Sequence, residues 1–308
     1  GYGLLLALLW AGTAVLREGP APASLDFDTE RAFATARALI PDDRPHPSGS
    51  DENARVAARI TTLLEHYDYT VQRQAELLCT DFSPGCTQLE NLVAVKPGRQ
   101  PGGDAILLTA HYDSAPGAPG AGDDIAGVAA LLEVARLLAA EPPLANDVIF
   151  LIADAEEAGL RGAMAFAERH PLMPRVQLVF NLEARGVTGP SLMFETSEGN
   201  AALLELFAAS ASRPVATSLM YEVYRRMPNN TDFTIYRDAG APGLNFAFSR
   251  GVALYHSSRD DLKRLNPASL GHHGDNVLHL VRQAGNTDLA ALRSKDNASY
   301  VDLFGRHL

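Results

Sequence analysis

The stretch AILLTAHYDSAPGAPGAGDDIAGVAALLEVARLLAA, residues 105–140, combines three kinds of local sequence. Its first seven residues are mostly apolar and end at His111. A loop of Gly, Ala and Pro follows, and two adjacent aspartates, Asp123 and Asp124, then precede an apolar-faced segment from Ile125 to Ala140. A continuous apolar run before a helix is typical of a strand buried on both faces of a parallel sheet. The stretch therefore predicts a strand–loop–helix unit of an α/β protein.

The same alternation of apolar strands and helices extends through most of the chain. The predicted strands are 69–74, 91–96, 105–111, 147–154, 176–184, 191–196 and 243–248. The predicted helices are 29–39, 54–66, 125–140, 163–170, 200–212 and 267–282. Strands that alternate with amphipathic helices indicate an α/β/α sandwich, in which helices cover both faces of a largely parallel, mixed central sheet.

The composition is that of a folded globular protein. Of 308 residues, 46% are hydrophobic and 20% are charged, which argues against a disordered chain. The net charge is −11, and the 26 Lys and Arg residues form no run. Because nucleic-acid binding normally requires a clustered basic face, we expect no nucleic-acid partner. No pattern in the sequence predicts a protein partner either.

The N-terminal segment GYGLLLALLWAGTAVL, residues 1–16, carries no charged side chain. It is shorter than the roughly 20 residues that cross a bilayer as a helix, so it reads as the remainder of a longer span, a signal anchor or a buried core helix. We expect residues 1–24 to be a membrane anchor plus linker, residues 25–290 the folded domain, and residues 291–308 a C-terminal extension. The domain would then lie outside the cytoplasm, in the periplasm, an organelle lumen or the extracellular space.

The two cysteines, Cys79 and Cys86, flank a six-residue segment that contains Pro84 and Gly85. A disulfide could close this loop in an oxidising compartment. Their spacing alone fits two free thiols nearly as well, and it matches no metal-binding pattern. An extracytoplasmic domain favours the disulfide.

Acidic and imidazole side chains follow three of the predicted strands. His111 ends one strand, Glu156 and Glu157 follow the second, and Glu183 ends the third. The carboxyl ends of parallel strands meet at one edge of a sheet, so we expect these groups to converge. Two adjacent carboxylates repel one another unless a cation or a proton separates their roles.

Further candidate ligands lie in loops. One aspartate of the Asp123–Asp124 pair suffices to cap a helix, which leaves the other free. His256 is followed four residues later by Asp260, and Asp113 lies two residues after His111, so each imidazole has a nearby carboxylate that could orient it. Each of these features alone is more often structural than functional.

Taken together, the candidates form a metal-ligand set of two imidazoles and three carboxylates. Imidazole and carboxylate ligands suit two Zn²⁺ ions, with Mn²⁺ or Co²⁺ also possible. Glu156 remains as a general base that takes protons from a water between the metals. The ligand set is His111, Asp123, Glu157, Glu183 and His256.

The order of these motifs resembles that of the M28 family of zinc aminopeptidases, over roughly residues 33–282. The matching motifs are HYDS (111–114), PGAGDDIAGV (119–128), EEAGLRG (156–162), NLEARG (181–186) and YHSSRD (255–260). The resemblance implies one zinc held by His111 and Glu183, a second held by Glu157 and His256, and Asp123 as the bridge between them.

The same resemblance implies Glu156 as general base and Tyr255 as the group that steadies the oxyanion, with Asp113, Asp260 and Asp232 around the ligands. Many family members have Asp where this chain has Glu183. The subgroup with Glu resembles membrane-anchored proteases of the endoplasmic reticulum and vacuole and their bacterial relatives, often with further membrane spans.

The expected function is therefore release of N-terminal residues from peptides by a di-zinc hydrolase. Two alternatives stay open: a glutaminyl-cyclase-like acyltransferase with one zinc, and a non-catalytic receptor that keeps the peptidase fold. The chain's one Trp, Trp10, lies in the apolar N-terminus, which disfavours the cyclase. The Asn-x-Ser/Thr patterns at Asn229 and Asn297 are read as unmodified, and His272, His273 and His279 as packing or solvent-facing residues.

Overall fold

A computed structural model describes residues 19, 23–24, 26–300, 302–303 and 306–307. The predicted N-terminal anchor and Trp10 lie outside these residues. Among the helices within the described ranges, none combines the length and apolar character that a bilayer span requires.

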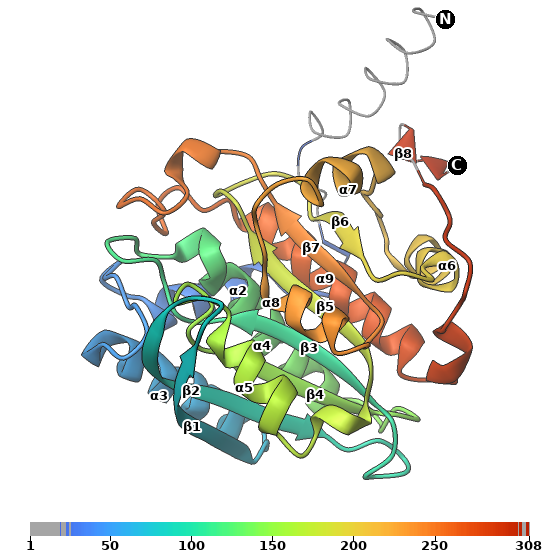
Figure 1. Ribbon diagram of the computed structural model, residues 1–308, viewed down its shortest axis with the longest axis horizontal. Helices are drawn as coiled ribbons and strands as arrows, with labels where there is room; N and C mark the ends of the chain where they lie inside the picture. The colour runs from blue at the N-terminus through green and yellow to red at the C-terminus, as the bar shows by residue number, and fades with distance from the viewer. Residues whose placement is uncertain (1–18, 20–22, 25, 301, 304–305, 308) are drawn as a thin grey trace, which may run out of the picture.

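The centre of the protein is a seven-stranded sheet whose order is β1-β2-β4-β3-β5-β7-β6 (Figure 1). The four middle strands, β4, β3, β5 and β7, run parallel, whereas β1, β2 and β6 join them in antiparallel pairs. The predicted mixed, largely parallel sheet is thereby confirmed. The strands are β1 (Val71–Thr80), β2 (Gly85–Lys96), β3 (Ala105–His111), β4 (Asp147–Ala153), β5 (Val176–Ala184), β6 (Leu192–Thr196) and β7 (Gly243–Phe248).

Helices cover both faces of the sheet, as predicted. Helices α2, α4 and α9 pack against one another behind the sheet in Figure 1, and α5 and α8 pack together in front of it. Helix α3 packs beside α2 and α4, α6 lies against α9, and α7 contacts β6. The helices are α2 (Thr29–Leu39), α3 (Asp51–His66), α4 (Ala126–Ala140), α5 (Arg161–Arg169), α6 (Ala201–Ser210), α7 (Ser218–Tyr224), α8 (Asp232–Asp238) and α9 (Pro267–Ala284).

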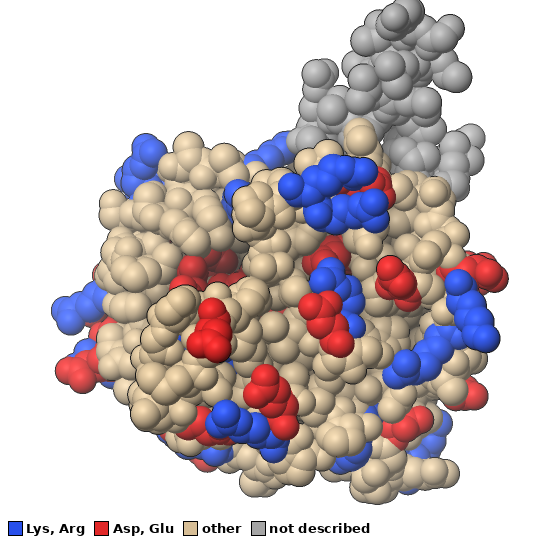
Figure 2. Space-filling view, in the orientation of Figure 1, with Lys and Arg blue, Asp and Glu red and all other residues tan. Residues whose placement is uncertain are grey.

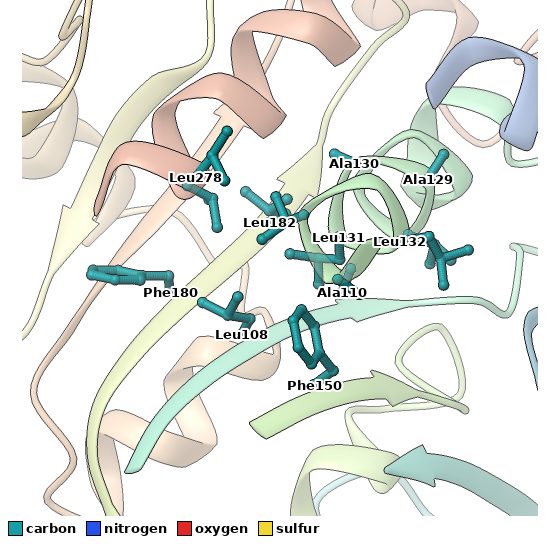
Figure 3. Close-up of a cluster of buried hydrophobic side chains, with 14 of the residues drawn as sticks. Leu108, Ala110, Ala129, Ala130, Leu131, Leu132, Phe150, Phe180, Leu182 and Leu278 are labelled. Carbon is teal, nitrogen blue, oxygen red and sulfur yellow. The ribbon is translucent and has the colours of Figure 1, made fainter. Parts of the chain in front are cut away.

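Successive side chains of the central strands enter two separate cores. In β3, Leu108 and Ala110 point to the α4 side, where Leu131 and Leu132 of α4 meet them (Figure 3). Leu107 of the same strand belongs to the core under α5 and α8. All seven residues of β3 are buried, and the same is true of β4. Each fully buried Leu or Phe stabilises the fold by about 1.5–3 kcal/mol, which is why these strands read as unbroken apolar runs.

The structure differs from the sequence prediction at the edges of the sheet. Strands β1 and β2 form a hairpin much longer than the predicted strands. Its outer residues are partly exposed and mix polar with apolar side chains, so they give no clear strand pattern in the sequence. Cys79 and Cys86 are opposite one another in this hairpin and form a disulfide.

Two short helices, α7 and α8, lie between residues 212 and 243, where the sequence analysis named no helix or strand. Helix α8 is only seven residues long, and a capping box between Thr231 and Thr234 begins it. Such a helix is too short to show a convincing apolar period in the sequence, whereas its cap depends on local hydrogen bonds. The helix matters because it begins at Asp232, one of the candidate site residues.

The segment after the predicted end of the domain at 290 packs on the body of the protein. Ala298 donates its backbone N–H to the Asn200 side chain, and Asn297 accepts a hydrogen bond from the Gly199 backbone N–H. Tyr300 exchanges hydrogen bonds with Ser218 at the start of α7. Residues 302–303 and 306–307 form a separate two-stranded sheet, β8 (Asp302–Leu303) and β9 (Arg306–His307).

Candidate metal centre at the carboxyl ends of the strands

The candidate ligands meet where the connections of the sheet diverge. Strand β3 lies between β4 on one side and β5 on the other, so the chain leaves β3 in one direction and returns on the opposite side. Open α/β sheets bind ligands at such a switch point. His111 ends β3 and Glu183 lies near the end of β5, whereas Glu157 and His256 follow β4 and β7 in loops.

The five candidate ligands form two overlapping clusters. His111, Asp123 and Glu183 make one cluster, and Asp123, Glu157 and His256 make the other; within each, the ligand atoms lie within 4.8 Å of one another. Asp123 belongs to both because its two oxygens face different imidazoles. Its Oδ1 lies 3.3 Å from His111 Nε2, and its Oδ2 lies 3.2 Å from His256 Nε2. This is the arrangement of a carboxylate that could bridge two cations.

Small residues allow the loop before α4 to carry Asp123 to this position. A Cβ on Gly122 would come within 2.3 Å of the Gly186 backbone oxygen, so only glycine permits this close approach. The Asp260 carboxylate accepts the backbone N–H groups of Gly122 at 2.7 Å and of Asp123 at 3.2 Å. The peptide bond between the two aspartates is cis, and Asp124 accepts the N–H of Gly127 in the first turn of α4. One aspartate thus faces the site, and the other accepts a hydrogen bond from the first turn of α4.

Asp113 connects two of the ligand-bearing strand ends. Its carboxylate oxygens accept the backbone N–H groups of Glu156 at 3.1 Å and Glu157 at 3.2 Å. His111 Nδ1 lies 3.0 Å from the Asp113 backbone oxygen and 3.4 Å from a carboxylate oxygen of the same residue. The sequence predicted that the Asp113 carboxylate orients the imidazole, whereas in the structure the nearer partner is the Asp113 carbonyl. An N–H at Nδ1 leaves Nε2 to face Asp123.

The other predicted site residues lie around the clusters. Glu156 lines the cavity. Its burial and the nearby Glu183 carboxylate hold its pKa well above the usual range. The Tyr255 ring stacks on the His256 ring with 3.7 Å between centroids, and His256 itself has φ +52°. Such left-handed backbone is uncommon for a non-glycine residue and clusters at functional sites. Asp232 is buried, neither of its carboxylate oxygens has a hydrogen-bond partner, and burial raises its pKa to about 7.

The site holds more negative charge than its protein groups neutralise. Burial raises the pKa of Glu157 to about 7, despite the nearby His256. Burial would also raise the pKa of Asp123, but His111 and His256 outweigh it and lower that pKa to about 2. Burial lowers the pKa of His256, and Asp123 and Glu157 more than reverse this, to about 9. Anions crowded in this way favour a bound cation.

The contact between Glu157 and His256 also supports zinc as the ion that these side chains would bind. Glu157 Oε1 is buried and receives no hydrogen bond, although His256 Nε2 lies only 2.9 Å away. A carboxylate oxygen and an imidazole nitrogen that approach without a hydrogen bond are suitably placed to share a cation. Imidazole nitrogen and carboxylate oxygen are also the ligands of zinc in hydrolytic sites that keep a position open for water.

A cavity of about 890 Å³ opens onto these residues. One wall is polar and contains Glu156, Glu157, Tyr255 and His256. Other lining residues are apolar and come from β6, α7 and the segments around them, with Phe82 of the disulfide-closed hairpin also contributing. The main apolar residues are Leu192, Phe194, Met220, Val223, Met227 and Val252. A cavity that joins a polar cluster to an apolar wall suits a ligand with both characters.

Two residues near the site were not predicted from the sequence. Arg185 lines the cavity. It lies two residues after Glu183 in NLEARG, and this spacing was the signal from which its place near the site could have been predicted. His273 is fully buried in α9, where its ring nitrogens lie 3.0 Å from the Glu183 backbone oxygen and 2.6 Å from Ser191 Oγ. The sequence predicted His273 only as a packing or solvent residue, and no local pattern connects it to β5.

On the face drawn in Figure 2, cationic and anionic side chains are interspersed, and neither sign forms a continuous patch. In the buried cluster, by contrast, carboxylates from four separate segments come together.

The fold belongs to the zinc-exopeptidase-like class of α/β/α sandwiches. The zinc aminopeptidase of Bacillus subtilis superposes with a TM-score of 0.70 at 15% identity, covering 86% of this chain and 97% of that one. The glutaminyl cyclase of Porphyromonas gingivalis superposes with a TM-score of 0.69 at 18% identity, covering 84% and 99%. At these identities the likeness concerns the fold alone.

The sequence identifies the family. Residues 91–281 match the model of peptidase family M28, and the chain belongs to this family. It is 34% identical over 270 residues to endoplasmic reticulum metallopeptidase 1 of Rattus norvegicus, covering 82% of this chain and 30% of the relative. It is 30% identical over 271 residues to a vacuolar membrane protease of Candida dubliniensis, covering 85% and 29%. The chain therefore spans about 30% of the length of these relatives.

Proposed function

We propose that this chain is a zinc-dependent exopeptidase that releases N-terminal residues from peptides with the help of two metal ions. The proposal rests on the position of Asp123, whose two carboxylate oxygens face two different imidazole–carboxylate clusters. One ion would be held by His111 and Glu183, the other by Glu157 and His256, and both by Asp123. Membership of a peptidase family supports the reaction class.

When bound, a pair of such cations lowers the pKa of a water and polarises a carbonyl group. The chain's own groups do the rest. Glu156 lies in the cavity wall but outside both ligand clusters, so its carboxylate is free to take a proton from the attacking water and to return one to the leaving amine. The Tyr255 hydroxyl, beside His256, donates to the oxygen of the reacting carbonyl as negative charge develops on it.

The location we propose is a membrane, with the catalytic domain on the oxidising side. Named relatives are membrane or endoplasmic reticulum proteases, and the Cys79–Cys86 disulfide suits a non-cytosolic compartment. In this proposal residues 1–24 serve as anchor and linker, residues 25–290 as the peptidase domain, and residues 291–308 as an extension. We propose no nucleic-acid or protein partner.

The test combines metal analysis with a substrate panel. The purified protein is assayed on aminoacyl arylamides, on N-blocked peptides and on peptides with N-terminal Gln, before and after dialysis against a chelator. We expect about two zinc ions per chain, hydrolysis of the arylamides, loss of activity after chelation and recovery with added zinc.

The alternatives give different results in the same experiment. One zinc per chain and cyclisation of the N-terminal Gln peptides would indicate an acyltransferase instead. Bound metal without turnover of any peptide would indicate a non-catalytic protein of the same fold. Cleavage of N-blocked peptides at their C-terminal end would agree with an exopeptidase, but one that releases C-terminal rather than N-terminal residues.

A further inference from the structure

Arg185 is the one Lys or Arg among the described residues that line the metal-site cavity. Its guanidinium carbon lies 5.8 Å from the centroid of the Tyr255 ring, which in turn stacks on His256. Arg185 thus lies against the same ring as the candidate ligand His256, and it remains partly exposed. It therefore stands beside the place where a bound peptide would lie.

The contacts of Arg185 leave its charge uncompensated. The acids that surround the cavity do not form an ion pair with it in the part of the chain that the structure describes. By contrast, Arg237 pairs with Glu195, and Arg161 donates to Thr87 and to the Ser83 backbone oxygen. Its neighbours are the Tyr255 ring and the Asn229 side chain, whose amide oxygen accepts a hydrogen bond from the guanidinium. Both neighbours are neutral, and both orient the planar fork without using up its charge.

We propose that Arg185 binds a carboxylate of the peptide substrate, on the leaving side of the scissile bond. The inference rests on the proposed peptidase function and narrows its substrates to peptides that present a free carboxylate close to the cleaved bond. A guanidinium fork matches a carboxylate with two parallel hydrogen bonds, which a neutral amide cannot reproduce. The carboxylates that line the cavity are those of Glu156, Glu157 and Glu183, so Arg185 is also the group that makes an anionic substrate end acceptable there.

The geometry limits where this carboxylate is located. Successive α-carbons of a peptide are about 3.8 Å apart, so the α-carboxylate of a dipeptide lies within one residue of the bond that is cut. Arg185 and His256 both lie against the Tyr255 ring, with the guanidinium carbon 5.8 Å and the imidazole centroid 3.7 Å from its centroid, so the guanidinium is within about two to three residues' length of His256. A side-chain carboxylate on the first leaving residue could reach the same fork. The two sources share one chemistry, and the experiment separates them.

The experiment compares matched substrates on the zinc-loaded protein. Leu-Gly and Leu-Gly-amide differ only in the α-carboxylate, and Leu-Glu-amide and Leu-Gln-amide differ only in the side-chain carboxylate. For the wild type we expect kcat/KM to be ~10–100-fold higher for the acid member of at least one pair, the range expected of charge-assisted hydrogen bonds, mostly through KM. In Arg185→Gln this ratio falls to near one, and Arg185→Lys keeps part of it.

Arg225→Gln is the matched control, because Arg225 is an exposed cation of the α7 region that does not line the cavity. It should keep the wild-type ratio. Equal kcat/KM for both members of both pairs in the wild type would overturn the proposal, and so would a ratio that survives in Arg185→Gln. Calorimetry with the Glu156→Gln variant measures the ratio of the two affinities within each substrate pair in the absence of turnover. A carboxylate preference in binding by a protein that hydrolyses nothing would support this inference while contradicting the proposed function.

Discussion

The Asp260 carboxylate accepts the backbone N–H of Asp123 at 3.2 Å, although 137 positions separate the two residues in the sequence. Its second oxygen accepts the N–H of Gly122, so one side chain fixes both peptide units that lead into the candidate bridging residue. Asp113 acts in the same way on the opposite side, where it holds the N–H groups of Glu156 and Glu157. The candidate ligands are thus positioned by a surrounding layer of carboxylates that bind backbone rather than metal.

We expect Asp260→Asn to lower zinc affinity by ~10–100-fold, the usual effect of removing a group that orients a ligand. The amide keeps one acceptor but places an NH₂ group against a backbone N–H, so the Asp123 loop loses one of its two anchors. Competition with a chromophoric chelator measures the affinity. Asp261→Asn removes the same charge from the next residue, whose side chain pairs with Arg264 instead, and should leave the affinity unchanged. Equal affinities in the two variants would show that Asp260 does not orient Asp123.

Replacing the two adjacent glutamates one at a time separates their proposed roles. Glu156 lies outside both ligand clusters, so Glu156→Gln should retain the metal content while kcat falls by ~10²–10⁴-fold, as expected when a general base is lost. Glu157→Gln, by the same substitution one residue later, should lower zinc content, because Glu157 belongs to the His256 cluster. Metal analysis and initial rates are measured on the same preparations. Near-normal turnover by Glu156→Gln would mean that another group takes the proton.

The buried centre of the fold could be predicted because its physical signal is local. Strands β3 and β4 are buried along their whole length, so their sequences are unbroken apolar runs. Ligand types at the ends of these runs also appear in the sequence. Since the carboxyl ends of parallel strands lie at one edge of the sheet, the sequence alone predicts that His111 and Glu183 meet.

The remainder depends on contacts between distant segments. Nothing local to His273 indicates that its ring reaches the backbone of Glu183, because that contact joins α9 to β5. The outer part of the β1–β2 hairpin is partly exposed and mixes polar residues with scattered apolar ones such as Leu77, so it lacks the continuous apolar pattern that identified the inner strands. The apolar wall of the cavity likewise combines Phe82 with residues of β6 and α7, which only the fold brings together.

Phe82 offers a direct test of that wall. Its side chain is 54% exposed at the tip of the disulfide-closed hairpin and lines the cavity, and Arg161 holds the tip through the backbone oxygens of Ser83 and Gly85. We expect Phe82→Ala to raise KM for substrates with a large apolar side chain by ~3–10-fold, since part of an aromatic contact worth about 1 kcal/mol is lost.

The control for Phe82→Ala comes from the same hairpin. Leu77 is 62% exposed but does not line the cavity, so Leu77→Ala should leave KM unchanged. Steady-state kinetics with leucyl and glycyl substrates distinguish a substrate contact from a general loss of stability. An increase in KM of the same size for the glycyl substrate would argue against an apolar contact with Phe82.

The pH dependence of stability can be tested at His272, which is buried in α9 and belongs to neither ligand cluster. Its Nδ1 accepts the backbone N–H of Ser191 at 3.1 Å, and its Nε2 lies 3.0 Å from the backbone oxygen of Arg213, so the ring is held neutral. Burial lowers its pKa below the ordinary 6.5. Above pH 6.5 both folded and unfolded states are neutral at this ring, whereas below it the unfolded chain takes up a proton that the folded protein resists. Stability is therefore lost as the pH falls.

His272→Asn keeps an acceptor near the Ser191 N–H but cannot titrate. Denaturant unfolding at pH 8 and pH 5 should show that the wild type loses more stability on acidification than the variant does, by up to about 1.4 kcal/mol per pH unit below 6.5. Comparing the two proteins cancels the contributions of the other titrating groups, which both retain. If the difference in unfolding free energy between them were the same at both pH values, the ring would have to gain its proton equally in the folded and unfolded states. In that case the Ser191 and Arg213 contacts would not hold it neutral.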